Sequence, residues 1–410
     1  MAAGKLRRME LARTRLSEIA WLFLKLGTTA FGGPAAHLAL MQDEVVTRRG
    51  WLTVQEFLDM YAATNFIPGP NSTEMAIHIG YRRAGWRGLV VAGSCFIVPA
   101  ALMCTGLAAI YKAYGHNPAS LAILWGVKPV VIAVVGQALW RLGKSAIKTW
   151  LAGSVAVLAA AALLVQLALL GTEHELLVLF GGGLAVALAR GVRKRRFLPV
   201  FAWPLAQTTG AAATAAATTT AGAPLLSVFL IFLKIGSVLF GSGYVLLAFL
   251  QADFVDRNHW LTQTELLDSV AVGQVTPGPV FTTATFIGYL VAGPWGAVVA
   301  TVGIFLPAFA FVALSAPILP RLRKSVFFGA FLDGLNAASL ALMAVVLMRL
   351  AGDALGIVTP NGYGMDWAAA ALAALSLIAL LWKNFNSIWL LLIGAAVGMI
   401  RAWVLRKTGA

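Results

Sequence analysis

Charge is scarce in this chain: Asp, Glu, Lys and Arg make up 11% of its 410 residues, whereas 60% of the residues are hydrophobic. A soluble domain carries roughly 25% charged residues, and the mean hydropathy here is +0.83. The low charge therefore excludes an ordinary soluble domain. Apolar stretches of about 20 residues, the length that crosses a bilayer as a helix, occur near residues 16–41, 88–110, 121–140, 151–170, 176–189, 225–250, 297–317, 326–347, 367–381 and 389–404. The sequence predicts an all-α polytopic membrane protein.

Cysteine and enzyme motifs are also scarce. Cys95 and Cys104 lie in one apolar stretch without metal-ligand spacing, which predicts packing residues. His174-Glu175 lacks the second histidine of a zinc site, and no Gly-x-x-x-x-Gly-Lys-Ser/Thr or Gly-x-Ser-x-Gly motif is present. We therefore expect no enzyme activity, no metal, no cofactor and no direct use of ATP. A membrane enzyme acting on lipid or peptide is the weakest rival reading.

The net charge of +15 comes from basic residues at the ends of the apolar stretches. This distribution follows the positive-inside rule and does not predict a nucleic-acid partner. Part of the excess could attract an anionic substrate. The basic clusters are Arg82/Arg83/Arg87, Arg141/Lys144/Lys148, residues 190–196 and Arg321/Arg323/Lys324.

One sequence pattern occurs twice. Trp51-Leu52-Thr53 leads to Pro68-Gly69-Pro70, and 209 positions later Trp260-Leu261-Thr262 leads to Pro277-Gly278-Pro279. Beyond this point the match continues at a spacing of 208, for example from Pro99 to Pro307. A repeat of this length in an apolar chain is typical of a transporter built from two related halves. We expect the halves at residues 1–190 and 224–410, joined by a linker at 191–223.

The basic clusters also predict the orientation of the halves. If residues 82–87 are cytoplasmic, the basic group at 321–324 is expected on the same side, although its matching positions 113–115 would be outside. The halves would then form an inverted-topology repeat. The number of spans stays open, because residues 57–81 and 266–291 could either cross or dip in and return.

Each Pro-Gly-Pro breaks its segment into two half-helices, because proline removes a backbone donor and clashes with the preceding turn. Thr53-x-x-Glu56 and Thr262-x-x-Glu265 are capping boxes that begin the first half-helix, and capping is the favoured role of both glutamates. Phe31-Gly32-Gly33-Pro34 is a further break. It pairs with Phe240-Gly241-Ser242-Gly243 in the second half.

A half-helix that begins after Pro-Gly-Pro directs free N–H groups and a positive dipole end at one point, which is a ready anion site. The alternative is that the prolines only kink the helices for packing. On the anion-site reading, the breaks and the small polar residues beside them bind the substrate: Gly32, Gly33, Asn65, Gly69, Asn71, Ser72, Thr73, Gly241, Ser242, Gln274, Thr276, Gly278 and Thr282.

Several charged residues lie in or beside the apolar stretches. Lys25 and Lys234, at matching positions, are candidate substrate ligands, with snorkelling to the interface as the alternative. Arg48 and Arg257 could form a vestibule that attracts anions, or simply anchor the chain at the interface. Three acids, Asp59, Asp268 and Glu74, are coupling candidates. Glu74 has no acidic counterpart in the second half, so it is a candidate proton carrier, and His78 is a weaker one.

At this point the duplicated motifs are sufficient to suggest a family. Phe31-Gly-Gly-Pro34, Trp51-Leu-Thr53 and Pro68-Gly-Pro70-Asn71, with their second copies, resemble those of the chromate ion transporters in their long, two-domain form. The resemblance covers almost the whole chain outside the linker and termini. It implies a multi-pass protein of the bacterial inner membrane that exports chromate and confers resistance, with sulfate as the structural analogue of the substrate.

Taken together, the sequence predicts a secondary transporter that exports a divalent tetrahedral oxyanion. Import or exchange of sulfate or another oxyanion is the alternative, and a passive channel is a third reading. The expected partners are the oxyanion, the lipid bilayer and, as an open possibility, a second copy forming a homodimer.

Overall fold

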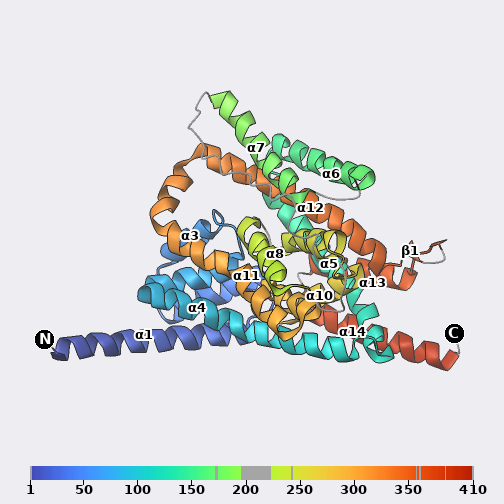
Figure 1. The fold of residues 1–410 in the computed structure, drawn as a ribbon, viewed down its shortest axis with the longest axis horizontal. Helices are drawn as coiled ribbons and strands as arrows, with labels where there is room; N and C mark the ends of the chain where they lie inside the picture. The colour runs from blue at the N-terminus through green and yellow to red at the C-terminus, as the bar shows by residue number, and fades with distance from the viewer. Residues whose placement is uncertain are drawn as a thin grey trace.

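The structure is a computed structural model that describes residues 2–170, 174–194, 223–241, 243–356, 358–359, 362–383 and 385–408 (Figure 1). Its first half contains α1 (Ala2–Thr29), α2 (Gly33–Gln42), η1 (Asp43–Arg48), α3 (Val54–Thr64), α4 (Asn71–Tyr114), α5 (Pro118–Ala146), α6 (Trp150–Leu170) and α7 (Glu175–Lys194). Its second half contains α8 (Leu225–Val238), η2 (Gly243–Val245), α9 (Leu246–Leu250), η3 (Gln251–Arg257), α10 (Gln263–Val275), η4 (Val280–Thr282), α11 (Thr283–Lys324), α12 (Val326–Ala354), β1 (Val358–Thr359), β2 (Gly362–Tyr363), α13 (Trp367–Trp382) and α14 (Ser387–Thr408).

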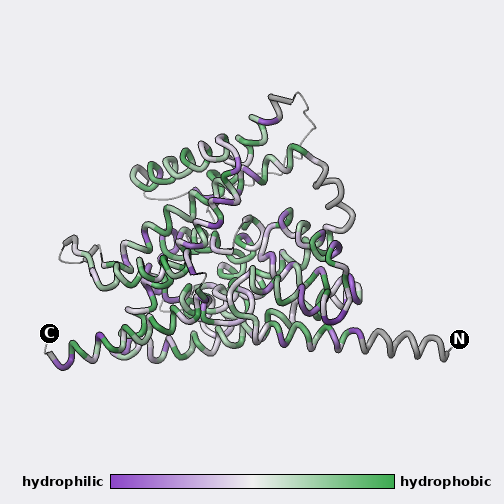
Figure 2. Tube along the Cα trace, turned by 180° about the vertical axis from the view of Figure 1, so that it is seen from behind, coloured by the Kyte–Doolittle hydropathy of each residue, from purple (hydrophilic) through white to green (hydrophobic). Residues whose placement is uncertain are grey.

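The described residues are helical apart from the connections and the two-residue pair β1–β2. Among them, six helices are long and apolar enough to cross a membrane, in α4, α5, α6, α11, α12 and α14. Hydrophobic residues predominate along these helices in Figure 2. The prediction of an all-α polytopic membrane protein is confirmed. Most of the expected linker, residues 195–222, lies outside the described residues.

Two of the apolar stretches are not single helices. α1 ends at Thr29, and α2 begins after Gly32, whose φ of 101° requires glycine. In the second half, α8 ends at Val238, and Gly241 adopts a φ of 96°. The glycine breaks expected from the sequence are thus present, and each is followed by a short π-helical segment, η1 or η3.

α4 and α11 each reverse direction at one glycine. Residues 84–85 and 292–293 leave helical geometry, and Gly85 and Gly293 have φ values of 61° and 69°. Beyond each reversal the two arms pack tightly through glycine: Gly80 contacts Gly88, and Gly288 contacts Gly296. α4 therefore consists of a short arm, residues 71–83, and a long arm, residues 86–114.

The segment before the long arm folds back on itself as a hairpin. α3 has 11 residues and spans about 16 Å, too short to cross the hydrocarbon core of about 30 Å. Arg82, near the end of the short arm, donates to Glu56 at the start of α3, over 3.2 Å. The two half-helices thus run antiparallel, and Pro68-Gly69-Pro70 forms the tip of a hairpin. We call this hairpin tip 1 and the matching Pro277-Gly278-Pro279 tip 2.

The last two helices of each half pack against the other half. α5 packs against α13 and α14, and α12 packs against α6 and α7 (Figure 1). Glycines permit close approach at both crossings, between Gly126 and Gly394 and between Gly334 and Gly182. The halves are therefore interleaved: one hydrophobic cluster draws residues from both halves, whereas a smaller cluster around Phe23 and Phe96 belongs to the first half alone.

Candidate functional site

Tips 1 and 2 each dock on the broken helix of the opposite half. The Gly69 N–H donates to the carbonyl of Leu239 over 2.8 Å, and the Gly278 N–H donates to the carbonyl of Ala30 over 2.9 Å. Ala30 and Leu239 occupy matching positions in the repeat, so the two hydrogen bonds are reciprocal. Each tip thus rests on the broken helix of the other half, which gives two matching pairs of broken segments.

Both tips require glycine, because their backbone has a positive φ and because a Cβ would come too close to neighbouring atoms. Gly69 has a φ of 135° and Gly278 a φ of 87°, both in the region that favours glycine. A Cβ on Gly278 would lie 2.8 Å from the Cβ of Ala100, and a Cβ on Gly69 would lie 2.5 Å from Oε1 of Glu74. A larger residue at Gly278 would push tip 2 away from the helices it contacts, whereas a larger residue at Gly69 would displace the Glu74 carboxyl.

Tip 2 is lined by hydroxyls and a thiol. The Cys104 thiol, on the long arm of α4, lies 3.6 Å from the Thr276 hydroxyl and 3.5 Å from the Thr282 hydroxyl. All three residues are buried. In this state the Thr282 hydroxyl donates to the Pro279 carbonyl, but a hydroxyl can rotate toward another acceptor. Cys104, which the sequence indicated only as a packing residue, belongs to this polar cluster.

Tip 1 is lined mainly by apolar groups, with one carboxyl and one hydroxyl. Ile67 and Val312, at the positions that match Thr276 and Cys104, belong to a buried hydrophobic cluster. Glu74 is fully buried against Gly69, and neither of its carboxyl oxygens has a hydrogen-bond partner among the described residues. The Thr73 hydroxyl is also without a partner there.

The remaining predicted polar residues lie around the tips in pairs. The Asn71 amide donates to the Asn65 side chain over 3.0 Å, and the Tyr244 hydroxyl donates to Gln274 over 3.2 Å. Ser72 is buried at the start of α4. Gly33 has a φ of 75°, whereas Ser242 lies outside the described residues.

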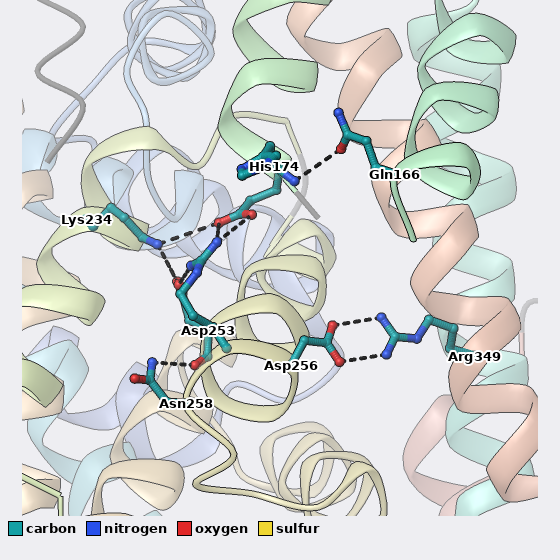
Figure 3. A network of polar contacts seen from close by, with 9 residues as sticks. Gln166, His174, Lys234, Asp253, Asp256, Asn258 and Arg349 are labelled. Atoms are coloured by element: carbon teal, nitrogen blue, oxygen red, sulfur yellow. Dashed lines mark hydrogen bonds and ion pairs between the residues drawn. The ribbon is translucent and has the colours of Figure 1, made fainter. Parts of the chain in front are cut away.

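Lys25 and Lys234 each face an acid on the π-helical segment that follows the glycine break. Lys25 pairs with Glu44 over 2.8 Å, and Lys234 donates to Asp253 over 2.7 Å (Figure 3). Glu44 and Asp253 are also 209 positions apart. The lysines are therefore charge-compensated, while Lys25 keeps 47% of its side chain exposed.

The second of these networks is larger. Asp253 also accepts from Arg257, and Glu175 of α7, which is buried, pairs with Lys234 over 3.6 Å and with Arg257 over 3.3 Å. Nearby, Arg349 of α12 forms a bidentate pair with Asp256 (Figure 3). Sequence reasoning missed the acids Glu44, Asp253 and Glu175. The equal spacing of the first two from their lysines was the available signal.

The other predicted charges lie nearer the surface. Arg48 pairs with Asp43 over 2.7 Å, and Asp59 accepts from Gln55 over 3.2 Å. The capping boxes are confirmed, with Thr53 paired to Glu56 and Thr262 paired to Glu265. The backbone N–H of Thr53 and the Arg82 guanidinium hold the pKa of Glu56 below its usual value, as expected for a capping carboxylate.

Asp268 is buried, whereas its counterpart Asp59 is exposed. The Tyr111 hydroxyl donates to one Asp268 oxygen over 2.8 Å, and Lys128 of α5 lies 3.5 Å from the other. Sequence reasoning missed Lys128, although a lysine within an apolar span was itself a signal. The described residues contain no group of three His, Cys, Asp or Glu that could hold a metal ion.

Comparison with known proteins supports the same reading. The family model described as "Chromate transporter" matches residues 17–187 and 226–399, once in each half. The chain belongs to the chromate transporter family. No solved structure matches the chain.

Several relatives align with most of the length of the chain. A "Chromate transport protein" of Pseudomonas aeruginosa is 33% identical over 92% of the chain and 89% of its own length. One of Cupriavidus metallidurans is 32% identical over 82% of each, and a "Probable chromate transport protein" of Synechococcus elongatus is 30% identical over 83% of the chain. A role in chromate transport follows from the family. The apolar helices make the chain a multi-pass membrane protein, and the bacterial relatives indicate the inner membrane.

Proposed function

We propose that this protein exports chromate from the cytoplasm and thereby confers resistance, binding the anion at the docked tips. The observation that carries the proposal is the reciprocal docking of the two tips. Behind tip 1, the Thr73 and Glu74 N–H groups bond to the Pro70 carbonyl, which leaves the first N–H groups of the helix without an intrahelical acceptor. Such helix ends favour an oxyanion without needing a full charge.

Tip 2 is the better anion site of the two. Its hydroxyls and thiol can turn toward oxyanion oxygens, whereas the Glu74 carboxyl occupies the space beside Gly69 at tip 1. Binding at tip 2 with a titrating Glu74 at tip 1 would let one proton exchange with one anion. Glu74 is therefore the first choice for a coupling residue.

The arrangement of the hairpins supports halves of opposite orientation. The hairpin of tip 1 packs against the start of the long arm of α4, at Gly88. The hairpin of tip 2 packs against the other end of the same arm, where Tyr111 meets Asp268. Hairpins that enter from opposite sides and meet at the centre suit alternating access. We propose repeats at residues 1–190 and 224–410, joined through 191–223.

The membrane potential favours export of chromate. Moving one charge through 100 mV is worth about 2.3 kcal/mol, and a dianion gains about twice that when it leaves a cell that is negative inside. Proton exchange at Glu74 would add to this driving force without being required by it.

Everted membrane vesicles test the proposal directly. With an imposed potential, positive inside the vesicle, we expect saturable accumulation of chromate that excess sulfate inhibits, since the two dianions share shape and charge. Vesicles with matched expression of Thr282→Val should show a raised KM. Accumulation that does not saturate would instead indicate a channel, and no accumulation under any gradient would overturn export.

A further inference from the structure

Lys128 is a charged residue in the middle of the apolar helix α5. Its Nζ lies 3.5 Å from Oδ1 of Asp268, and the exposed fraction of its side chain is 18%, against 2% for Asp268. A contact of 3.5 Å is longer than an ordinary charged hydrogen bond. The amino group is therefore neutralised by Asp268, without being tightly bound to it.

The same carboxylate is fixed from the other side. The Tyr111 hydroxyl, on the long arm of α4, donates to Oδ2 of Asp268 over 2.8 Å. Tyr111 in turn packs edge-on against Phe286 of α11, with the ring centroids 5.5 Å apart. Asp268 would thus keep one hydrogen bond if Lys128 moved away, so the ion pair can open without leaving the carboxylate bare.

The ion pair lies below tip 2 on one continuous interface. Cys104, at the tip, is followed on the long arm of α4 by Ala108 and Tyr111, and Ala108 packs with Phe286. On α10, Asp268 lies eight residues before Thr276, or about 12 Å along the helix. An apolar layer, Ala108 and Phe286, therefore separates the polar cluster of tip 2 from the ion pair.

The lysine of this pair has no counterpart in the repeat. The position that matches Lys128, 208 residues later, is Asn336, and the position that matches Asp268 is the exposed Asp59, which accepts from Gln55. A lysine and an aspartate inside a membrane are costly, and such residues commonly mark a transport pathway. If they only held helices together, the matching contact in the first half would be expected to use a similar device.

We propose that Lys128 is an anion-binding residue, a second position for the oxyanion between tip 2 and the membrane surface at which the long arm of α4 ends. Asp268 neutralises Lys128 while this position is empty. A dianion that passes the apolar layer attracts Lys128 more strongly than the single carboxylate does, so the lysine exchanges partners and Asp268 retains Tyr111. The inference rests on the proposed oxyanion transport and adds a residue and a position to it.

Four variants test the exchange: Lys128→Met, Asp268→Asn, the double variant Lys128→Met/Asp268→Asn, and the control Lys112→Met. Lys112 is an exposed lysine on the long arm of α4, next to Tyr111. Two quantities are measured for each, the KM for chromate in everted vesicles and the shift of Tm that chromate or molybdate causes in the purified protein. We expect Asp268→Asn to lower the KM for chromate several-fold, because the carboxylate no longer competes with the anion for Lys128. A change of this size corresponds to about one hydrogen bond to a charged group. Lys128→Met should raise KM about tenfold and lose the Tm shift. The control should match the wild type.

The double variant separates binding from a structural role. It removes both charges, so it should fold as the wild type does and yet keep the raised KM. Wild-type KM in the double variant, or a raised KM in Asp268→Asn, would show that the pair only holds helices together and would overturn the inference. Failure of the proposed function gives a different result. Wild-type vesicles would accumulate no chromate, but a Tm shift present in the wild type and absent in Lys128→Met would still support the anion site. No Tm shift in the wild type overturns the site whatever the vesicles show.

Discussion

Tip 2 is surrounded by the hydroxyls of Thr276 and Thr282 and the thiol of Cys104, whereas tip 1 has apolar side chains, the carboxyl of Glu74 and a single hydroxyl, that of Thr73. Both tips contain a glycine at positive φ that donates to the opposite half. The repeat has therefore preserved the docking of the tips, while the chemistry around them has diverged. A symmetric fold of this kind can hold the anion on one side and a titrating group on the other.

The largest effect is expected from the feature the tips share. Gly278→Ala places a Cβ 2.8 Å from Ala100 and 3.0 Å from the Gly27 carbonyl, on a residue with a φ of 87°. Clash and strain together should cost several kcal/mol and abolish transport, with less protein in the membrane. Gly106→Ala, a glycine of α4 with open space around it, is the control and should transport normally. Normal transport by Gly278→Ala would mean that the tips need not dock.

The next effect distinguishes the tips. Thr282→Val removes a hydroxyl from the polar tip and should raise the KM for chromate about tenfold, the worth of one hydrogen bond to a charged group. Thr73→Val changes the matching position in tip 1. No hydrogen bond to the anion is expected there, so KM should change less than twofold. The measurement is the initial rate of chromate uptake into everted vesicles over a range of concentrations. Equal changes in the two variants would remove the distinction between the tips.

A third experiment concerns the carboxyl of tip 1. Glu74→Gln keeps the shape of the side chain but cannot exchange a proton, so chromate uptake should continue under an imposed potential and no longer respond to a pH gradient. Thr283→Gln, at the matching position of tip 2, tests whether a larger side chain alone has this effect. Uptake by Glu74→Gln that still follows the pH gradient would exclude this carboxyl as the coupling group.

The smallest effect is expected from labels that leave the site untouched. Single added cysteines at Arg87 and Trp295, matching exposed positions beside the two reversal points, should leave transport near normal in a Cys95→Ser background that keeps the buried Cys104. Because the hairpins are expected to enter from opposite sides, a membrane-impermeant thiol reagent should reach one cysteine in intact cells and the other only in everted vesicles. Labelling of both from one side would contradict halves of opposite orientation.

The sequence by itself determined what depends on the local backbone. Helices end at local signals, namely Pro-Gly-Pro, Gly32 and Gly241, and they begin at the capping boxes of Thr53 and Thr262. Both the helix breaks and the helix starts were therefore predictable. Hydrophobic length predicted the spanning helices, and the 209-residue repeat predicted two related halves. These signals need no knowledge of which segments touch.

Only the tertiary structure decided the partners. Lys25 and Lys234 were candidate anion ligands from sequence, and the fold places Glu44 and Asp253 beside them. Lys128 meets Asp268 across 140 positions of sequence because α5 of one half packs on α10 of the other. Which charge faces which acid depends on how interleaved helices cross. That crossing is set by glycine contacts and burial throughout the molecule, so no local pattern in the sequence contains it.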